Sequence, residues 1–370
     1  MEILFQKGKK RDVKALWFNE DGSEVNFINQ RVLPHKIEIL KSNSVEKTAE
    51  YIKTMVIRGA PSIGIAGAYG IVQSVSKAYE MKMDKTPKKF YNKLIQDSNL
   101  LFQTRPTAID LKNSLDTMLS LWSPEISDTP PLLEDYRSKS LELTKNLIDQ
   151  CKAIAKTGLS LIKNGFNIIT HCHTGSFATV DIGTAIAPLK LAVENGMDIH
   201  VYVDETRPRF QGGKLTAWEL KQAEVPCTII TDSTAASLMK TDKIDLAIVG
   251  ADRIACNGDF ANKIGTYNLA VICFFHKIPF YTAAPWSTFH TDLIDGNEIP
   301  IEERDTKEIT HTMVNKNHEH LLTYDTKSVY NPAFDVTPNS LLSGIIVPGQ
   351  ILVDPFKDSI ENVVIPILKK

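Results

Sequence analysis

Apolar positions in the first part of the chain recur every three to four residues, which is the period of an α-helix. This pattern predicts three amphipathic helices, at residues 44–55, 63–81 and 88–102. A short region at 13–27 predicts strands instead. At 123–133, three prolines stand among small polar residues, which excludes a continuous helix and makes this segment the best candidate for a domain boundary. We therefore predict a mainly helical first domain with a few strands over residues 1–130.

The pattern changes after a long helical stretch at 134–163. Five short apolar runs follow that are typical of buried strands, at 166–170, 199–203, 227–231, 245–249 and 279–283. Because helical patterns separate these runs, they predict a parallel sheet wound by right-handed crossovers, which is a Rossmann-like domain over 131–370. The predicted fold class is α/β. Ligands in such a domain bind outside the carboxyl ends of the strands, so the residues after each run are the candidates for an active site.

Composition adds limits to this picture. The 370 residues exceed what one hydrophobic core usually supports, which agrees with two domains. Lys and Arg number 42 against 44 Asp and Glu, so the net charge of −2 argues against nucleic acid or an anionic membrane as a partner. No apolar stretch resembles a membrane span and the N-terminus does not resemble a secretory signal, so we expect a cytoplasmic location. The five cysteines show no C-x-x-C spacing, which predicts neither a disulfide framework nor a zinc cluster.

A parallel sheet suggests a nucleotide site, but the two glycine-rich phosphate loops, G-x-G-x-x-G and G-x-x-x-x-G-K-[ST], do not occur in the sequence. The closest string, Gly64-x-x-Gly67-x-x-Gly70, suits close packing between helices better than a ligand. We therefore predict no nicotinamide or ATP site.

A phosphate site is predicted at Arg58-Gly59-Ala60, where an arginine precedes a glycine turn and Pro61 is suited to opening a helix. For this string alone, a plain helix cap is an equal alternative. Further charge-assisted donors stand elsewhere in the chain, at Arg105, Asn262 and Lys263. The last two are expected at the start of another helix. Together these groups favour a small phosphorylated metabolite as the ligand.

Cys172 directly follows a predicted strand and precedes Thr174-Gly175-Ser176, which is expected to begin a helix. The helix dipole and nearby arginines would lower the pKa of the thiol, which is the setting of a reactive thiolate. A lone buried cysteine is usually inert, but the position at a strand end favours a function. His171 and His173 suggest a metal site as an alternative, and Asp252 is the one obvious further ligand. We predict no metal.

Asp252 follows the run at 245–249, so its carboxylate is expected to face the same crevice as Cys172. Partial desolvation there would raise its pKa and suit it to general acid catalysis. A capping aspartate, or an ion pair with Arg253, is an equally good interpretation of position alone. Gln211 could hydrogen-bond to sugar hydroxyls, although an isolated glutamine is more often structural.

Six longer strings indicate a family: IKTMVIRGAPSIGIAGAYG (52–70), QTRPTAIDL (103–111), THCHTGSFAT (170–179), VYVDETRPRFQGGKLTAWEL (201–220), GADRIACNGDFANKIGTYNLA (250–270) and NPAFDVTPNSL (331–341). In this order and over nearly the whole chain, they resemble the methylthioribose-1-phosphate isomerase family, which comprises aldose-ketose isomerases of methionine salvage. The wider family also holds the alpha, beta and delta subunits of translation initiation factor 2B and the ribose-1,5-bisphosphate isomerases.

This resemblance implies a small N-terminal domain on a Rossmann-like C-terminal domain, a homodimer, and a reaction that needs no metal or organic cofactor. It implies that Asp252 is the proton donor, and that Cys172 stabilises the transition state or acts as the base at C2. Substrate-binding positions of the family match Arg58, Gly59, Ala60, Arg105, Gln211, Asn262 and Lys263. The sequence departs from the family at His173, where Asn is frequent, and at Gly213-Lys214, where Ala-Arg is frequent.

The expected reaction converts 5-methylthioribose 1-phosphate into 5-methylthioribulose 1-phosphate. We expect an apolar pocket for the methylthio group, with Trp286 and Phe289 among its walls, which argues against ribose 1,5-bisphosphate but not against 5-deoxyribose 1-phosphate. The alternative from another class is a regulatory subunit of a translation-factor assembly that binds sugar phosphates or nucleotides without catalysis. Such a subunit needs neither Cys172 nor Asp252, and both stand here in full motifs, so the enzyme is favoured.

Overall fold

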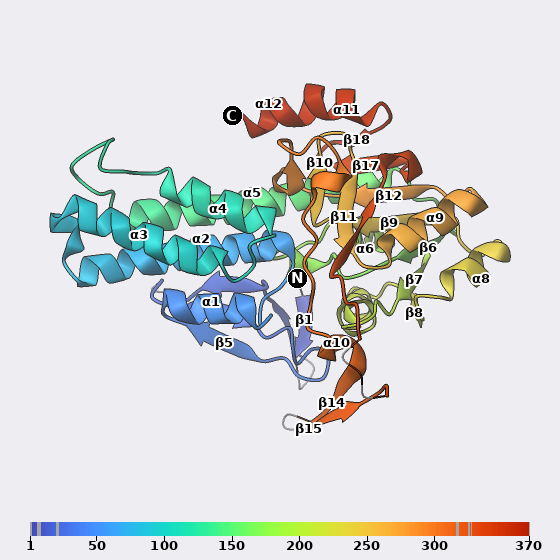
Figure 1. The fold of residues 1–370 in the computed structure, drawn as a ribbon. Coiled ribbons are helices and arrows are strands. Elements are labelled where there is room, and N and C mark those ends of the chain that lie inside the picture. The colour runs from blue at the N-terminus through green and yellow to red at the C-terminus, as the bar shows by residue number, and fades with distance from the viewer. Residues whose placement is uncertain are drawn as a thin grey trace.

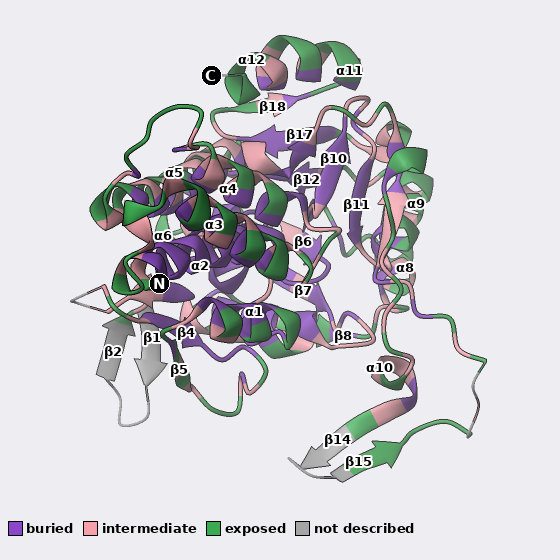
Figure 2. Ribbon diagram, turned by 60° about the vertical axis from the view of Figure 1, so that its left-hand side comes forward, coloured by how far each residue is buried: buried purple, intermediate pink, exposed green. Residues whose placement is uncertain are grey.

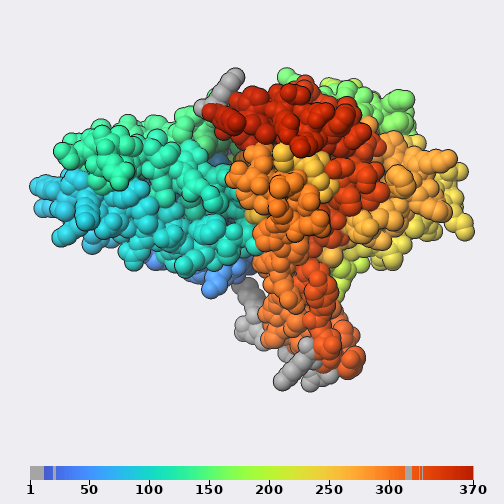
Figure 3. Space-filling view, turned by 45° about the horizontal axis from the view of Figure 1, so that its top comes forward, coloured from blue at the N-terminus to red at the C-terminus, as the bar shows by residue number. Residues whose placement is uncertain are grey.

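The computed structural model of this chain describes residues 2–5, 9–19, 22–315, 318–324, 326 and 328–369. They form two lobes that lie side by side, one built mainly of helices and the other around a seven-stranded sheet (Figure 1). A narrow arm, which carries residues near 310, projects away from both lobes (Figure 3). The predicted fold class is therefore confirmed, with a helical first part and a mainly parallel sheet in the second.

The first lobe is a bundle of helices beside a small sheet. Its helices are α1 (Val45–Lys53), α2 (Ala60–Glu80), α3 (Pro87–Phe102), α4 (Ile109–Leu119) and α5 (Leu133–Leu159). The three helices predicted before residue 103 and the long one after the proline-rich segment are confirmed, and α4 was not predicted. The Ser44 hydroxyl oxygen accepts a hydrogen bond from the backbone N–H of Lys47 at 3.2 Å, which caps α1 where the apolar period begins.

The small sheet beside these helices is antiparallel. Its strands are β3 (Leu16–Phe18), β4 (Val25–Ile28) and β5 (Ile39–Ser42), and a separate hairpin pairs β1 (Glu2–Phe5) with β2 (Lys9–Asp12). The strand region predicted at 13–27 holds β3 and most of β4. The strand β5 was not predicted, because its short ILKS segment is half exposed and carries little periodic signal.

The glycines of α2 allow neighbouring helices to approach closely. A Cβ atom added at Gly64 would lie 2.8 Å from the carbonyl oxygen of Asp110 in α4. At Gly67 and Gly70 it would meet the side chains of Leu111 and Leu101 at 2.5 and 2.8 Å. The predicted packing role of this glycine string is confirmed.

The second lobe is organised by the seven-stranded sheet. Its strands are β6 (Asn167–Thr170), β7 (His200–Asp204), β8 (Cys227–Ile230), β9 (Leu246–Gly250), β12 (Phe280–Ala283), β17 (Gly344–Val347) and β18 (Gln350–Leu352). The spatial order is β18-β17-β12-β9-β6-β7-β8, and all neighbours are parallel except β17 and β18. All five predicted strands are present. From β6 the chain first builds toward β8 and then returns to place β9 on the other side of β6.

Helices cover both faces of this sheet, so its central strands are largely buried, whereas the edge strands β8 and β18 are partly exposed (Figure 2). Apolar residues of α5, α6 (Ala187–Glu194) and α7 (Ala217–Gln222) pack with one set of strand side chains, which includes Ile168 and Leu246. Apolar residues of α8 (Ala235–Lys240) and α9 (Thr266–His276) pack with the alternate set, which includes Ile169 and Ala247. Because neighbouring residues of one strand point to opposite faces, these fully apolar runs require both layers of helices.

A second, four-stranded sheet lies beside the first. It joins β13 (Phe289–His290), β10 (Arg253–Ala255), β11 (Phe260–Lys263) and β16 (Phe334–Thr337) in that order. The arm carries α10 (Lys307–Thr310), β14 (His311–Asn315) and β15 (His318–Leu321), and the chain ends with α11 (Phe356–Ser359) and α12 (Ile365–Leu368). Among the described residues, no helix is long and apolar enough to cross a membrane.

The helix α5 connects the two lobes. Its buried side chains Tyr136, Leu147 and Cys151 belong to the core of the first lobe, and Ile154 belongs to the core under the large sheet. The boundary near residue 130 stays a prediction.

Candidate active site

A single cavity lies at the carboxyl ends of β6 and β9, where the order of strands reverses. Such a reversal separates two loops that leave the sheet in opposite directions, and ligands of doubly wound sheets bind in the resulting crevice. All nine residues predicted to act in catalysis or binding line this cavity: Arg58, Gly59, Ala60, Arg105, Cys172, Gln211, Asp252, Asn262 and Lys263. The structure therefore brings the predicted residues together, and their individual roles stay predictions.

Cys172 is held in an unusual backbone conformation. Its φ of 68° lies in the left-handed region, which costs a residue with a side chain about 1–3 kcal/mol. Two hydrogen bonds hold it there. The Cys172 N–H donates to the Thr206 hydroxyl at 2.9 Å, and the Thr216 hydroxyl donates to the Cys172 carbonyl at 2.7 Å. The Gln211 amide nitrogen lies 3.5 Å from the thiol sulfur, so the sulfur faces a polar donor inside the cavity.

The helix expected to begin at Thr174-Gly175-Ser176 is only a single 3₁₀ turn. Residues 176–178 form one short turn, and the next helix, α6, begins only at Ala187. The two ends of the loop at 174–184 are joined by a hydrogen bond, which the Thr184 N–H donates to the Thr174 carbonyl at 2.8 Å. The expected positive surroundings of the thiol come from side chains: Arg58 and Lys263 both interact electrostatically with Cys172.

Asp252 lies in the short connection between β9 and β10. Its N–H donates to the carbonyl of Ala261 at 2.9 Å, which fixes the backbone against β11. Burial raises the pKa of its carboxyl group, although the cations Lys263, Arg105 and Arg58 act in the opposite direction. The predicted desolvation is confirmed, and it suits a proton donor.

The interpretation of Asp252 as a simple ion-pair partner of Arg253 loses support. The Arg253 guanidinium instead donates a hydrogen bond to the carbonyl of Thr107, which lies in the segment between α3 and α4. Arg253 thus ties the helical lobe to the edge of the cavity. Asp252 interacts electrostatically with Lys263, Arg105 and Arg58, and its pKa is raised.

The predicted phosphate site has the local structure that the sequence indicated. Gly59 has φ 96° and directly precedes α2, and Pro61 lies in the first turn of that helix. A Cβ atom at Gly59 would lie 2.5 Å from the Cα of Ala178, so only glycine fits. The buried atoms Nη2 of Arg58 and Nε of Arg105 have no hydrogen-bond partner among the described residues. These N–H groups are donors suited to an anion.

Asn262 and Lys263 do not stand at the start of a helix, as was predicted, but at the end of the strand β11. Pairing of β11 with β10 and β16 extends this strand, and α9 begins only after Gly265 turns the chain with φ 102°. The Lys263 ammonium donates to the carbonyl of Ala333 at 2.6 Å. An ammonium has three donors, so Lys263 can also bind a phosphate.

Two arginines of the cavity were not predicted. Arg209 and Arg304 both line it. Both form ion pairs with the carboxylate of Glu308, at 2.7 Å for Arg209 and 3.2 Å for Arg304. Arg209 lies two residues before Gln211, so its position in that string was a usable signal. Arg304 comes from a distant charged segment without a motif, and only the fold brings it to the cavity.

The apolar wall differs from the predicted one. Trp286 and Phe289 are not among the lining residues, because both pack into the core beneath the large sheet, and Phe289 pairs with β10. Apolar lining comes instead from Met55, Ile63, Ile299, Pro300 and Phe334. The cavity therefore has an apolar wall, but residues other than Trp286 and Phe289 form it.

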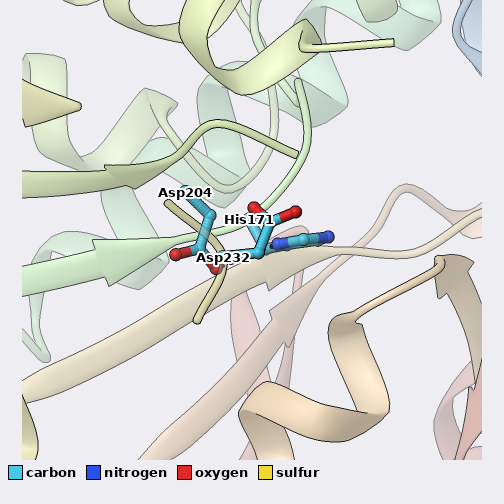
Figure 4. A group of neighbouring side chains, drawn as sticks. All are labelled: His171, Asp204 and Asp232. Atoms are coloured by element: carbon cyan, nitrogen blue, oxygen red, sulfur yellow. Dashed lines mark hydrogen bonds and ion pairs between the residues drawn. The ribbon is translucent and has the colours of Figure 1, made fainter. Parts of the chain in front are cut away.

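His171 belongs to a group that has the spacing of a metal site but is used for hydrogen bonding. His171, Asp204 and Asp232 come together at the ends of β6, β7 and β8 (Figure 4). Both ring nitrogens of His171 have partners, Asp204 at 2.9 Å and the carbonyl of Ile264 at 2.9 Å. The Asp232 carboxylate accepts the N–H groups of Thr206 and Arg207, each at 2.7 Å. This group orders the strand ends behind the cavity, and we assign it no metal.

Comparison with known proteins agrees with this fold and site. The family model described as "Initiation factor 2 subunit family" matches residues 56–348, so the chain belongs to that family. Within it, the chain is similar to methylthioribose-1-phosphate isomerases. It is 44% identical over 339 residues to methylthioribose-1-phosphate isomerase 2 of Pseudothermotoga lettingae, covering 91% of this chain and 94% of that one. The identity is 42% to the isomerase of Thermotoga maritima, over 92% of this chain and 96% of the relative.

Solved structures show the same relationship. The 5-methylthioribose 1-phosphate isomerase of Pyrococcus horikoshii is 36% identical with a TM-score of 0.84, and 96% of each chain is covered. The subunit delta of translation initiation factor eIF-2B from A. fulgidus is 31% identical with a TM-score of 0.78, over 95% of this chain and 99% of that one. The same fold therefore occurs in a protein named as an isomerase and in a protein named as a translation initiation factor subunit. The function of this chain has to be argued from its site.

Proposed function

We propose that this protein is an aldose-ketose isomerase that converts 5-methylthioribose 1-phosphate into 5-methylthioribulose 1-phosphate, a step of methionine salvage. The observation that carries the proposal is the meeting of Cys172 and Asp252 in one cavity with several cationic groups. Relatives at more than 40% identity over most of the chain are named methylthioribose-1-phosphate isomerases, which supports the same function.

The 1-phosphate determines what the site has to do. A phosphate ester on the anomeric oxygen prevents simple opening of the sugar ring to a free aldehyde, so an acid must protonate the ring oxygen as its bond to C1 breaks. Asp252 is suited to this step because burial keeps its carboxyl group protonated to higher pH than usual. Arg58, Arg105 and Lys263 bind the phosphate and hold C1 next to this acid.

The second part of the reaction moves a hydrogen from C2 to C1. Cys172 follows the carboxyl end of the neighbouring strand β6 and acts at C2, with Gln211 donating toward its sulfur. Asn262 and Gln211 offer amide groups for the sugar hydroxyls. The mechanism uses side chains alone, so we expect full activity in an excess of EDTA.

The test is a direct isomerisation assay with purified protein. We expect turnover of 5-methylthioribose 1-phosphate, and a loss of at least roughly a hundredfold in kcat for Cys172→Ser and for Asp252→Asn, the scale of one acid or base. Circular dichroism and Tm control for folding. Near-normal turnover in either variant would remove that residue from the mechanism. Binding of sugar phosphates without turnover by the unaltered protein would favour a regulatory subunit.

The methylthio group is the first choice for the substituent on C5. Met55, Ile63 and Phe334 give part of the cavity an apolar wall, which suits a thioether, whereas a second phosphate there would require further cations. Comparing kcat/KM for 5-methylthioribose 1-phosphate, 5-deoxyribose 1-phosphate and ribose 1,5-bisphosphate tests this choice. A wide preference for the bisphosphate would contradict both the apolar pocket and the place in methionine salvage.

Two copies of the chain form a homodimer in this proposal. The residues Tyr267, Val271, Phe274 and Phe275 lie on one face of α9 and are exposed, Phe274 by 65% and Phe275 by 79%. A contiguous exposed apolar face of this kind marks a protein interaction site. A cytoplasmic location is also proposed, and it is supported by five free cysteines, which fit a reducing compartment.

A further inference from the structure

His173 lines the same cavity as Cys172 but has no part in the mechanism above. Its side chain is fully buried, and its ring nitrogen Nε2 lies 2.7 Å from the Oε1 atom of Glu219 in α7. The Glu219 side chain is 1% exposed. A buried histidine and carboxylate at this distance form a dyad whose protonation states decide what the imidazole can do.

The dyad is arranged so that Glu219 carries the negative charge. The backbone N–H of Ser176 donates to Oε2 at 2.8 Å, and the N–H of Phe177 donates to Oε1 at 3.3 Å. The ammonium of Lys190 lies 3.7 Å from Oε2. Burial alone would raise the pKa of Glu219, but His173, Lys190 and the Ser176 N–H together lower it. An ionised carboxylate only accepts hydrogen bonds, so Nε2 of His173 carries the hydrogen and donates it.

The other ring nitrogen of His173 is therefore free to accept a proton. Burial lowers the pKa of His173, and the cations Arg58 and Lys190 lower it further, whereas Glu219 raises it. The net effect is a lowered pKa, so the ring is neutral at pH 7. With its one hydrogen on Nε2, Nδ1 holds a lone pair. Nδ1 is buried and has no hydrogen-bond partner in the described part of the chain. A carboxylate behind an imidazole fixes its tautomer and stabilises the imidazolium that forms when a proton arrives.

We propose that His173, oriented by Glu219, is the residue that accepts the proton of the sugar 2-hydroxyl. The inference rests on the proposed isomerase function. In the reaction the bond between C1 and the ring oxygen breaks, and that oxygen takes a proton from Asp252. The hydrogen on C2 moves to C1 with its bonding electron pair, which replaces the pair that left C1 with the ring oxygen, while the O–H bond at C2 breaks and its electrons form the ketone. One proton enters at the ring oxygen and one leaves at the 2-hydroxyl, so an acid and a separate acceptor are both needed.

Two substitutions separate this role from a structural one. His173→Gln can place an amide nitrogen near the former Nε2 and keep the hydrogen bond to Glu219, while the lone pair of Nδ1 is lost. Phe177→Leu is the matched control, because Phe177 packs against the His173 ring at 6.2 Å but has no proton to exchange. We expect His173→Gln to lower kcat roughly a hundredfold at pH 7 with KM nearly unchanged. The control should keep its kcat within a few-fold, and Tm reports folding in both.

The pH profile gives a readout that a structural residue would not move. A neutral His173 is the active form, so kcat should fall as the pH drops through its lowered pKa, on the acidic side of the value near 6.5 of an ordinary histidine. This acidic limb should disappear in His173→Gln. An unchanged kcat and an unchanged acidic limb in that variant would overturn the proposal.

Nitrogen NMR of the unaltered protein tests the tautomer without any activity. Specific ¹⁵N-histidine labelling, with His173→Gln to assign the signal, should show the hydrogen on Nε2 and a bare Nδ1 at pH 7. A hydrogen on Nδ1 would overturn the proposal. A protein that shows the expected tautomer but does not isomerise 5-methylthioribose 1-phosphate would instead contradict the proposed function, so the two failures can be told apart.

Discussion

The protonation of Asp252 links a single buried side chain to the pH dependence of the whole reaction. A proton donor acts in its protonated form, and burial raises the pKa of this carboxyl group, so the proton-donating step is lost as the pH rises through that raised pKa. We therefore expect kcat to show a basic limb that belongs to Asp252.

Removing a charged side chain near Asp252 should change the pH at which this basic limb appears. Arg105 lowers the pKa of Asp252, so Arg105→Ala should shift the basic limb of kcat to higher pH, measured at saturating substrate. Lys112→Ala is the control, because its ion pair with Asp116 at 2.7 Å is half exposed and lies away from the cavity lining. A limb that stays in place in Arg105→Ala would assign it to another group.

The cationic side chains themselves are expected to act mainly in binding. Arg105 and Lys263 offer charge-assisted hydrogen bonds to the phosphate in the ground state and in the transition state alike. Such a bond contributes about 1.5–3 kcal/mol, so Lys263→Ala and Arg105→Ala should each raise KM roughly tenfold to a hundredfold, with a smaller change in kcat near the pH optimum. Steady-state kinetics measure the split. A large fall in kcat with unchanged KM would contradict the assignment as phosphate anchors.

At the scale of elements, the contact between α2 and α4 places the phosphate loop. Arg58 and Gly59 precede α2 directly, so their position depends on how that helix sits in the bundle. Gly64 is the contact that can adapt least, because a Cβ atom there would meet the backbone of α4 rather than only a flexible side chain. The helix cannot relax at this point without moving the residues that bind phosphate.

Gly64→Ala is expected to lower the free energy of unfolding by about 1–3 kcal/mol, the usual cost of overpacking, in spite of the better helix propensity of alanine. Chemical denaturation measures this change. Gly213→Ala is the control, since a Cβ atom there would have its nearest neighbour, a methyl group of Ile229, at an ordinary 3.7 Å. Equal stability of the two variants would contradict a close contact between α2 and α4.

At the scale of the whole molecule, the exposed apolar face of α9 lies on the outer side of the second lobe, away from the helical lobe (Figure 1). The cavity lies instead at the carboxyl ends of the central strands β6 and β9, and it is lined by residues of both lobes. Association through α9 would therefore leave the cavity accessible to substrate. This arrangement separates assembly from catalysis in the proposed homodimer.

The double variant Phe274→Glu with Phe275→Glu is expected to be a monomer, because two charges replace the most exposed apolar side chains of α9. Light scattering coupled to size exclusion gives the mass. Ile126→Glu is the control, since Ile126 is 67% exposed but lies in the proline-rich segment, and it should leave a dimer. A monomeric unaltered protein, or a dimeric double variant, would exclude α9 as the interface.

The sequence by itself determined the elements and the candidate chemistry. Apolar periods of 3.6 residues and short apolar runs depend only on which face of a local segment is buried, so they predicted α1 to α3, α5 and five parallel strands of the large sheet, β6 to β9 and β12. The ends of those strands then identified Cys172 and Asp252. Local turn chemistry was also readable, since Gly59 and Pro61 predicted the loop that opens α2.

The tertiary structure decided how these pieces meet. The strand order places β6 beside β9, and this long-range pairing, which no local pattern encodes, brings Cys172 and Asp252 to one cavity. Cys172 is held in its strained conformation by two hydrogen bonds, one donated by its N–H to the Thr206 hydroxyl and one donated by the Thr216 hydroxyl to its carbonyl, where a helix dipole was expected. In the same way, only the packing of α7 behind the loop gives His173 the partner that defines its tautomer. Contacts between distant segments depend on loop paths and packing, which the period of a sequence does not contain.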